Sequence, residues 1–257
     1  IVGNSVVNAS TQSAERGGNI RIVAKQIDLL DGGQLVASSF GTGDAGSIVV
    51  LVSDRLLIAG EDANFTEQVN NAQRILEEGD IENLRQVINR QGSNGLATDD
   101  PNNSAPSGIF TISEESGAAG SIIIRDASSK PSNNNSAQSE TTNRVVVQDT
   151  VDDRLDVVIG DGGTISAQAL RQGNAGSIII DISGALEMAN GNIRSDAAEL
   201  DGGDISVGAQ TLQMADRSSI NARASGRGDA GDIIVNIFDE LEISDSDIHL
   251  YKSRDHY

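Results

Sequence analysis

The chain of 257 residues contains no cysteine and no tryptophan, only 3 prolines, and aromatic residues at 2%. The lack of cysteine excludes disulfides, thiolate metal ligands and thiol nucleophiles within these residues. Large aromatic side chains normally dominate core burial. Any core must therefore be built from Ile, Val, Leu and Ala.

Basic residues are also scarce, with 18 Lys and Arg against 38 Asp and Glu, for a formal net charge of -20. This balance argues against nucleic acid as a partner and against adhesion to anionic lipid. The longest apolar runs, such as 48–52, are too short to span a bilayer, so we expect no membrane insertion. The first ten residues, IVGNSVVNAS, have neither Met nor the pattern of a signal peptide. We expect a piece of a longer protein, or a processed form.

Glycine is abundant, at 28 residues, and a glycine-containing phrase recurs six times. The copies are GGNIRI from Gly17, AGSIVV from Ala45, AGSIII from Ala119, AGSIII from Ala175, GGDISV from Gly202 and AGDIIV from Ala230. Their starts are 28, 74, 56, 27 and 28 residues apart. The repeat is thus about 28 residues long, and the two long spacings contain 46 and 28 additional residues. A fixed period of this length is typical of solenoids.

Each repeat has three segments with apolar residues at every second position. In the fourth repeat these positions are Ile178/Ile180, Leu186/Met188 and Ile193/Ser195. A period of two predicts strands with one side facing inward, and one repeat cannot bury its own apolar face. The predicted fold is all-β, a parallel β-helix (solenoid) of about six coils. Ile178, Ile205 and Ile233 should then form one vertical row in the interior. A β-propeller blade is longer than this repeat, a helical solenoid needs a 3.6-residue period, and no calcium-binding nonapeptide run is present.

The spacing of the segments sets the domain organisation. Ile109 precedes its phrase by ten residues, as Leu35 does, so the first 46 extra residues fall between Ile58 and Ile109. By the same comparison the next 28 fall between Ile124 and Val157. The expected units are a partial coil at 1–16, coils at 17–60, an inserted helical hairpin and polar loop at 61–107, a coil at 108–126, a disordered insertion at 127–150 and coils at 151–257. An extra edge strand is expected at 145–147.

Local signals agree with this division. Pro101, Pro106 and Pro131 all lie in the insertions, as strands paired on both edges require. Asp-Gly-Gly sequences at 31–33, 161–163 and 201–203 predict sharp turns with positive φ. The helical insertion is either a simple excursion or a partner-binding surface, because solenoid insertions often form binding faces.

The repeat pattern resembles a known family. AGSIxI, then LxM or LxI, then GxI, closed by GDAG or RQGNAG, is similar to the repeats of filamentous haemagglutinin-like exoproteins. These are adhesins of two-partner secretion systems. The stretch PSGIFTISEESGAAGSI, from Pro106 to Ile122, resembles cyanobacterial members in particular. The resemblance covers nearly all of the chain outside the insertions and carries no catalytic motif. The family's N-terminal secretion domain is not in this sequence.

The resemblance implies a right-handed, single-stranded β-helix that is secreted or held on the outer surface of a Gram-negative bacterium, a cyanobacterium. Its export partner would be an outer-membrane two-partner secretion transporter. We therefore expect a non-catalytic rod segment of an adhesin-like exoprotein, with cell-surface or carbohydrate receptors as further partners. We predict no catalytic, cofactor-binding or metal residues.

Several residues were weighed as sites. Arg227-Gly228-Asp229 spells the integrin tripeptide, but the equivalent junctions show that its Gly and Asp are turn residues of the repeat. The turn acids Asp44, Asp201 and Asp229 are either weak Ca²⁺ ligands or a means of keeping the surface soluble. His249 and His256, the only histidines, are expected to be solvated.

The alternative function is a carbohydrate-active β-helix enzyme, a polysaccharide lyase or hydrolase. The paired acids Asp99-Asp100 and Asp152-Asp153 are the candidates for acid and base chemistry, and both are expected to be turn or loop residues. Such an enzyme should have a groove along one parallel sheet, with acids and bases converging from adjacent coils. The outward positions of the first strand, among them Val49, Ile123 and Ile179, are mostly apolar. This favours the rod, and it predicts that this face packs against the helical insertion or a partner.

Overall fold

The computed structural model describes residues 1–3, 5–62, 105–127 and 154–252. Over these ranges all regular secondary structure is β, in 17 strands, and no helix is present. All strand pairs of the two large sheets are parallel, and one short pair is antiparallel. The prediction of an all-β fold built from parallel strands is confirmed.

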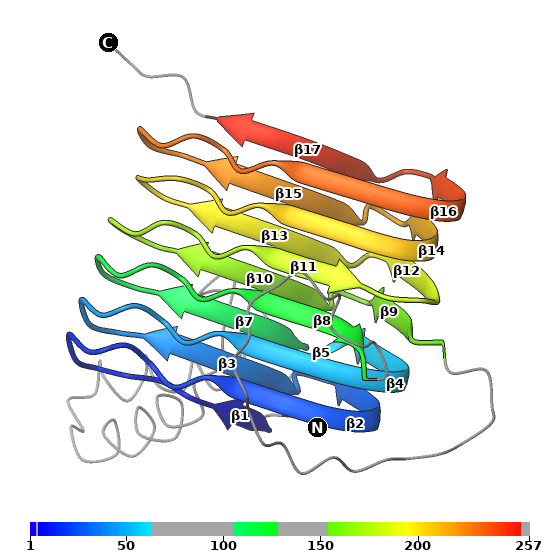
Figure 1. Cartoon of the computed structure of the whole chain (residues 1–257), viewed down its shortest axis with the longest axis horizontal. Helices are drawn as coiled ribbons and strands as arrows, with labels where there is room; N and C mark the ends of the chain where they lie inside the picture. Colours follow the sequence, from blue (N-terminus) through cyan, green and yellow to red (C-terminus); the bar gives the residue numbers. More distant parts are fainter. Residues whose placement is uncertain (4, 63–104, 128–153, 253–257) are drawn as a thin grey trace, which may run out of the picture.

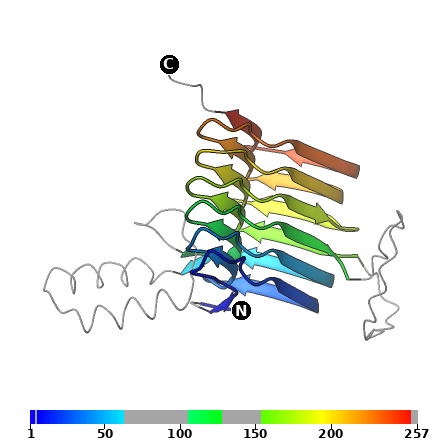
Figure 2. The same ribbon diagram turned by 60° about the vertical axis from the view of Figure 1, so that its left-hand side comes forward.

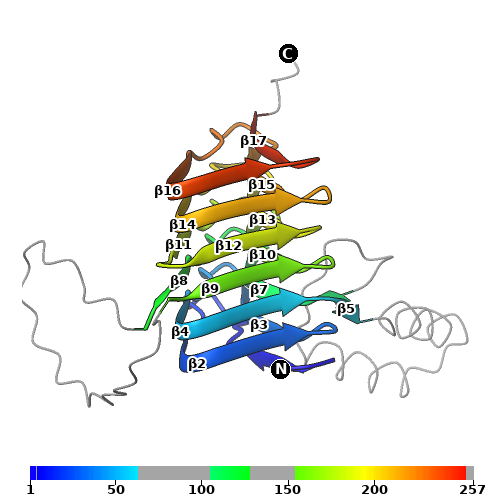
Figure 3. The same cartoon turned by 90° about the vertical axis from the view of Figure 1, so that its right-hand side faces the viewer.

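Two parallel sheets contain the strands of the repeats (Figure 1). The first has seven strands: β1 (Val6–Asn8), β3 (Gln34–Ser39), β7 (Gly108–Ser113), β10 (Thr164–Ala169), β13 (Asn192–Ala197), β15 (Ser219–Ala224) and β17 (Asp247–Lys252), in that order. The second has eight: β2 (Ile20–Leu30), β4 (Ile48–Ala59), β8 (Ile122–Asp126), β9 (Asp156–Gly160), β11 (Ile178–Asp181), β12 (Ala185–Ala189), β14 (Ile205–Ala215) and β16 (Ile233–Ile243). Successive repeats lie one above another, with β2 and β17 at opposite ends of the stack (Figure 3).

The predicted vertical row of isoleucines is present. The first isoleucine of each phrase pairs with its equivalent in the next repeat, in the order Ile20, Ile48, Ile122, Ile178, Ile205 and Ile233. The four inner members of this row are 0% exposed. These ladders, together with the matching rows from the first sheet, form one continuous aliphatic core.

The strands that flank the two insertions pair as the spacing of the segments requires. Ile58 pairs with Ile159, and Leu35 pairs with Ile109, as the segment spacing predicts. At the edges of the first insertion, β5 (Glu61–Asp62) pairs antiparallel with β6 (Ala105–Pro106). Apart from 61–62, 105–107 and 127, the expected helical hairpin with its polar loop and the expected disordered insertion lie outside the described residues, as does the strand expected at 145–147.

The strand division differs from the expected three separate strands per repeat. In β2, β4, β14 and β16 the first two apolar segments are one strand of 11 or 12 residues. No glycine or proline turn separates the two segments in these repeats. An irregularity in the pairing suffices to bend the strand, and one lies between Ala24 and Gln26 and another between Ala209 and Thr211.

Positive φ occurs at two of the three Asp-Gly-Gly turns. Asp31 and Gly32 have φ of 52° and 92°, and Asp161 and Gly162 have φ of 50° and 85°. The prediction is wrong for 201–203, where no residue has positive φ. Gly203 serves a different purpose there, because a Cβ on it would overlap the carbonyl oxygen of Gly176 in the repeat below.

This close approach recurs in five of the six repeats. The second glycine position of the phrase forms a column of six: Gly18, Gly46, Gly120, Gly176, Gly203 and Gly231. A Cβ on any of the last five would overlap the carbonyl oxygen of the glycine before it in the column. The column lies where the chain returns from the first sheet to the second, and only glycine permits backbones to approach so closely.

The outward face of the first sheet changes along the stack. On β3 and β7 the outward residues Val36 and Phe110 are 0% and 1% exposed and form a small cluster separate from the main core. On β15 and β17 the outward residues Arg223, His249 and Tyr251 are exposed. Among the described residues, this face is therefore buried at β3 and β7 and open in its C-terminal half, at β15 and β17.

Candidate functional site

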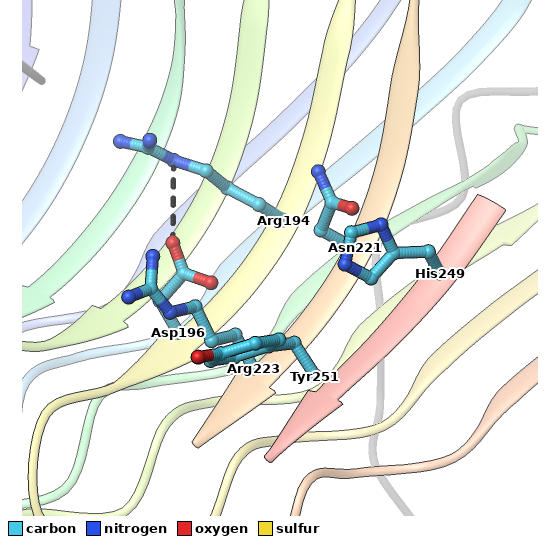
Figure 4. Close-up of a pocket in the computed structure, with 6 residues that line it drawn as sticks. All are labelled: Arg194, Asp196, Asn221, Arg223, His249 and Tyr251. Atoms are coloured by element: carbon cyan, nitrogen blue, oxygen red, sulfur yellow. Dashed lines mark ion pairs between the residues drawn. The ribbon is translucent and has the colours of Figure 1, made fainter. Parts of the chain in front are cut away.

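The open half of this face is hollowed by a shallow groove of about 360 Å³. Two side chains come from each of three adjacent strands: Arg194 and Asp196 from β13, Asn221 and Arg223 from β15, and His249 and Tyr251 from β17 (Figure 4). The volume is near the lower end of the range for small-molecule sites. We call these six residues the β13–β17 groove.

The parallel register explains why these side chains meet. Arg194 pairs with Asn221 and Asn221 with His249, while Asp196, Arg223 and Tyr251 form the second row. Residues two apart on a strand share a face, and neighbouring strands lie about 4.8 Å apart. Alternation and register thus place two rows of three polar side chains side by side on the sheet.

One end of the groove holds an internal ion pair. Arg194 Nε lies 3.8 Å from Asp196 Oδ2 and donates a hydrogen bond of 3.2 Å to Ser166 Oγ on β10. Both partners of the ion pair are partly buried, with side chains 22% and 28% exposed. Asp196 is the single carboxylate of the groove, and Arg194 balances its charge.

The other end presents unused donors. The Arg223 guanidinium carbon lies 5.2 Å from the centroid of the Tyr251 ring, and within the described chain this guanidinium has no hydrogen bond or ion pair. The His249 and Tyr251 rings meet edge to face, with centroids 6.4 Å apart at 64°. Two guanidinium groups against one carboxylate give the groove a net charge of +1 with His249 neutral. The groove is therefore locally positive on an acidic chain.

The acidic turn residues have structural partners. Asp44 Oδ1 accepts a hydrogen bond of 2.8 Å from the backbone N–H of Ala118, and Asp201 Oδ1 accepts one of 2.9 Å from that of Asp229. Each carboxylate thus caps the equivalent turn of the next repeat. Among the described side chains, no three His, Asp or Glu residues gather as metal ligands.

Asp229, the last residue of the Arg-Gly-Asp tripeptide, is paired with Lys252. The Lys252 ammonium donates a hydrogen bond to Asp229 Oδ1, and this bond and the lysine charge lower the pKa of the Asp229 carboxyl. The Asp229 carboxylate is therefore already paired with Lys252 at the surface, while Arg227, in the same turn, is exposed.

A second, smaller hollow lies at the turns and is lined by Glu115, Ser116, Arg171, Gln172 and Glu199. The adjacent Glu114 is partly buried, and this burial, with the charge of Glu115, raises its pKa, although Arg171 opposes the shift. Arg171 Nε lies 3.9 Å from Glu115 Oε1. The cluster is predominantly acidic, and its one arginine is already paired.

Of the residues weighed from the sequence, the structure brings only His249 into a groove. Asp99-Asp100, Asp152-Asp153 and His256 lie outside the described residues. On the second sheet the outward residues Val49, Ile123 and Ile179 are partly buried, and Ile234 is 52% exposed. Whether the insertion or a partner covers this face remains a prediction.

Sequence reasoning missed Arg194, Asp196, Asn221, Arg223 and Tyr251. The signal was available in the third segment, whose outward positions can be aligned across repeats in the same way as its inward ones. They change from Val and Phe in early repeats to Arg, Asn and His in the last three. The outward positions of the first segment, which are mostly apolar, carry no such signal.

In the part of the chain that the structure describes, no helix is long and apolar enough to cross a membrane. Comparison with protein-family models, with curated proteins and with solved structures gave no match.

Proposed function

We propose that this chain is a right-handed, single-stranded parallel β-helix and a non-catalytic rod segment of a secreted or surface-exposed, adhesin-like exoprotein. The observation that carries the proposal is the unbroken row from Ile20 to Ile233 and its companion ladders. Connections between parallel strands of one sheet are right-handed in about 98% of cases, which supports the handedness. Seven levels at about 4.8 Å correspond to a rod roughly 30 Å long.

The architecture suits a mechanical role. Each repeat contacts mainly its neighbours, so length is added by adding repeats without a new fold. The turns are crossed by backbone and carboxylate hydrogen bonds between repeats, such as that from Asp229 N–H to Asp201. The resemblance to filamentous haemagglutinin-like repeats adds the export route, through an outer-membrane two-partner secretion transporter of a Gram-negative, cyanobacterial cell.

Export is tested with the complete reading frame of the gene, expressed with and without a two-partner secretion transporter from the same genome. An epitope tag on the exposed turn that contains Arg227 is then probed on intact cells with antibody and external protease. The proposal expects surface labelling only when the transporter is present. Labelling that is independent of the transporter, or retention of the protein inside the cell in both cases, would contradict it.

The second candidate is a carbohydrate-active enzyme, and the β13–β17 groove is the observation in its favour. The groove lies along one parallel sheet and gathers side chains from three adjacent strands. Hydrolysis by the usual route needs two carboxyl groups flanking the bond, and this groove has one, paired with Arg194. Incubation with acidic and neutral polysaccharides separates the candidates. New reducing ends or unsaturated sugar products would favour the enzyme, whereas unchanged polymer favours the rod.

A further inference from the structure

We propose that the β13–β17 groove binds a carboxylated oligosaccharide and makes the last three repeats a recognition surface of the rod. The inference rests on the proposed non-catalytic, adhesin-like role and names its ligand class. It starts from a hollow on the first sheet's outward face in which charged side chains from adjacent strands gather.

The charge of the groove selects an anion. Arg223 is exposed and has its guanidinium donors free of protein acceptors within the described chain, while its guanidinium carbon lies over the Tyr251 ring, 5.2 Å from the centroid. This cation–π contact favours a position of the guanidinium above the ring and leaves its N–H donors available. A guanidinium held in this way presents a planar fork of donors, which matches a carboxylate. A neighbouring cation, Arg194, offsets the repulsion that Asp196 would exert on an incoming carboxylate.

The neutral members of the groove suit a hydroxyl-rich ligand. Asn221 contributes an amide, His249 an imidazole and Tyr251 a phenol, and each can exchange hydrogen bonds with hydroxyl groups. The Tyr251 side chain is 45% exposed and offers part of its apolar ring as well. A sugar ring presents hydroxyl groups at its edge and apolar C–H groups on its faces, which match these polar groups and the ring of Tyr251. The groups are spread over three rungs, so an extended chain of sugar rings could lie across the strands.

Two other polymers fit less well. A peptide most often joins a sheet by adding a strand at its edge, whereas this groove lies on the face of strands already paired on both sides, apart from β17. Nucleic acid binding needs clustered Lys and Arg side chains that contact several phosphates, whereas this chain has a formal net charge of -20. A short anionic ligand with many hydroxyl groups therefore matches the groove best.

The test uses the full chain and a tetrasaccharide of galacturonic acid, with binding measured by calorimetry. The wild-type protein should bind it, and the fully methyl-esterified tetrasaccharide, which lacks the charge, should not. Arg223→Gln should weaken binding about tenfold or more, because a hydrogen bond to a charged group is lost. Arg21→Gln, which removes an exposed arginine from the other sheet, is the matched control and should change affinity less than about twofold.

The outcomes distinguish failure of the proposed binding site from failure of the proposed non-catalytic rod. Absence of binding, or equal binding by the Arg223→Gln protein with its circular dichroism unchanged, would overturn the site and leave the rod intact. Equally tight, Arg223-dependent binding of a poly-glutamate peptide would overturn the assignment to a sugar. Recovery of shortened tetrasaccharide would overturn the non-catalytic role while supporting the groove as the place where the sugar binds.

Discussion

At the scale of single residues, the glycine column is a strict requirement of the stack. A side chain at Gly120 would occupy the space of the Gly46 carbonyl oxygen, which is fixed in its own backbone. Some glycines have more room. At Gly208 the nearest atom to an added Cβ would be Asp181 Oδ1 at 3.5 Å, an ordinary contact. The same amino acid is thus indispensable at one position and replaceable at another.

We expect Gly120→Ala to lower the free energy of unfolding by about 1–3 kcal/mol or more, the usual cost of forcing extra atoms into a packed region. Gly208→Ala should be neutral or slightly stabilising, because alanine restricts the unfolded chain. Urea denaturation followed by circular dichroism measures both. Equal stabilities for the two variants would show that the column tolerates a side chain.

Glu114 provides a pH-dependent contribution whose sign follows from its environment. Burial and Glu115 raise its pKa, so the folded protein favours the protonated form. This contribution to stability is present at low pH and is lost as the pH rises through the raised pKa. Glu114→Gln should therefore slightly raise the melting temperature at neutral pH and should have no such benefit in acid. The effect is small because the group is partly solvated. A lower melting temperature at neutral pH would contradict this reading.

At the scale of strands, the inward rows of aliphatic side chains contribute most to stability. Side chains at the ends of a row are less buried than those in the middle. Ile178 is 0% exposed, with Ile122 on one side and Ile205 on the other, whereas Ile233 is partly exposed and has a described neighbour on one side only. When an aliphatic side chain that is buried on both sides is truncated, the neighbouring strands cannot move to fill the cavity that it leaves. The cost of truncation should therefore depend on position along the row.

Ile178→Ala should destabilise the fold by about 2–5 kcal/mol, as for other large-to-small changes in a core. Ile233→Ala, the matched change at the open end, should cost clearly less because its site is already partly hydrated. Both are measured by chemical denaturation. A larger loss for Ile233 than for Ile178 would mean that the ends, and not the middle, hold the stack together.

The strands and their register could be predicted from the sequence because the repeat supplies six independent copies of one pattern. The spacing of Ile109 and of Val157 from the neighbouring segments predicted where the two insertions lie. The fusion of the first two segments, as in β2, could not be predicted, since a pairing irregularity has no residue signature as clear as a glycine turn. The polar residues of the groove could have been found by aligning the outward positions. The cation–π contact between Arg223 on β15 and Tyr251 on β17 depends on side-chain conformations, which the sequence does not specify.

At the scale of the whole molecule, the stack combines a regular interior with a variable outer surface. The inward rows are nearly uniform from repeat to repeat, while the outward face of the first sheet changes from buried Val36 and Phe110 to exposed Arg223 and Tyr251. Figure 2 shows the repeats as successive layers of one stack, with the described strands running across it. A uniform frame with a variable surface allows recognition to change without altering the fold.

The central claim is that repeats far apart in sequence lie in register, and the absence of cysteine makes it directly testable. Val49 and Ile123 are partners on β4 and β8, across the first insertion. Their strands are about 4.8 Å apart, a spacing that a disulfide can bridge. The double variant Val49→Cys/Ile123→Cys should form an intramolecular disulfide under mild oxidation. Val49→Cys/Arg125→Cys, offset by two residues to about 8 Å, should not. Efficient cross-linking of the offset pair and none of the aligned pair would contradict the stacked arrangement.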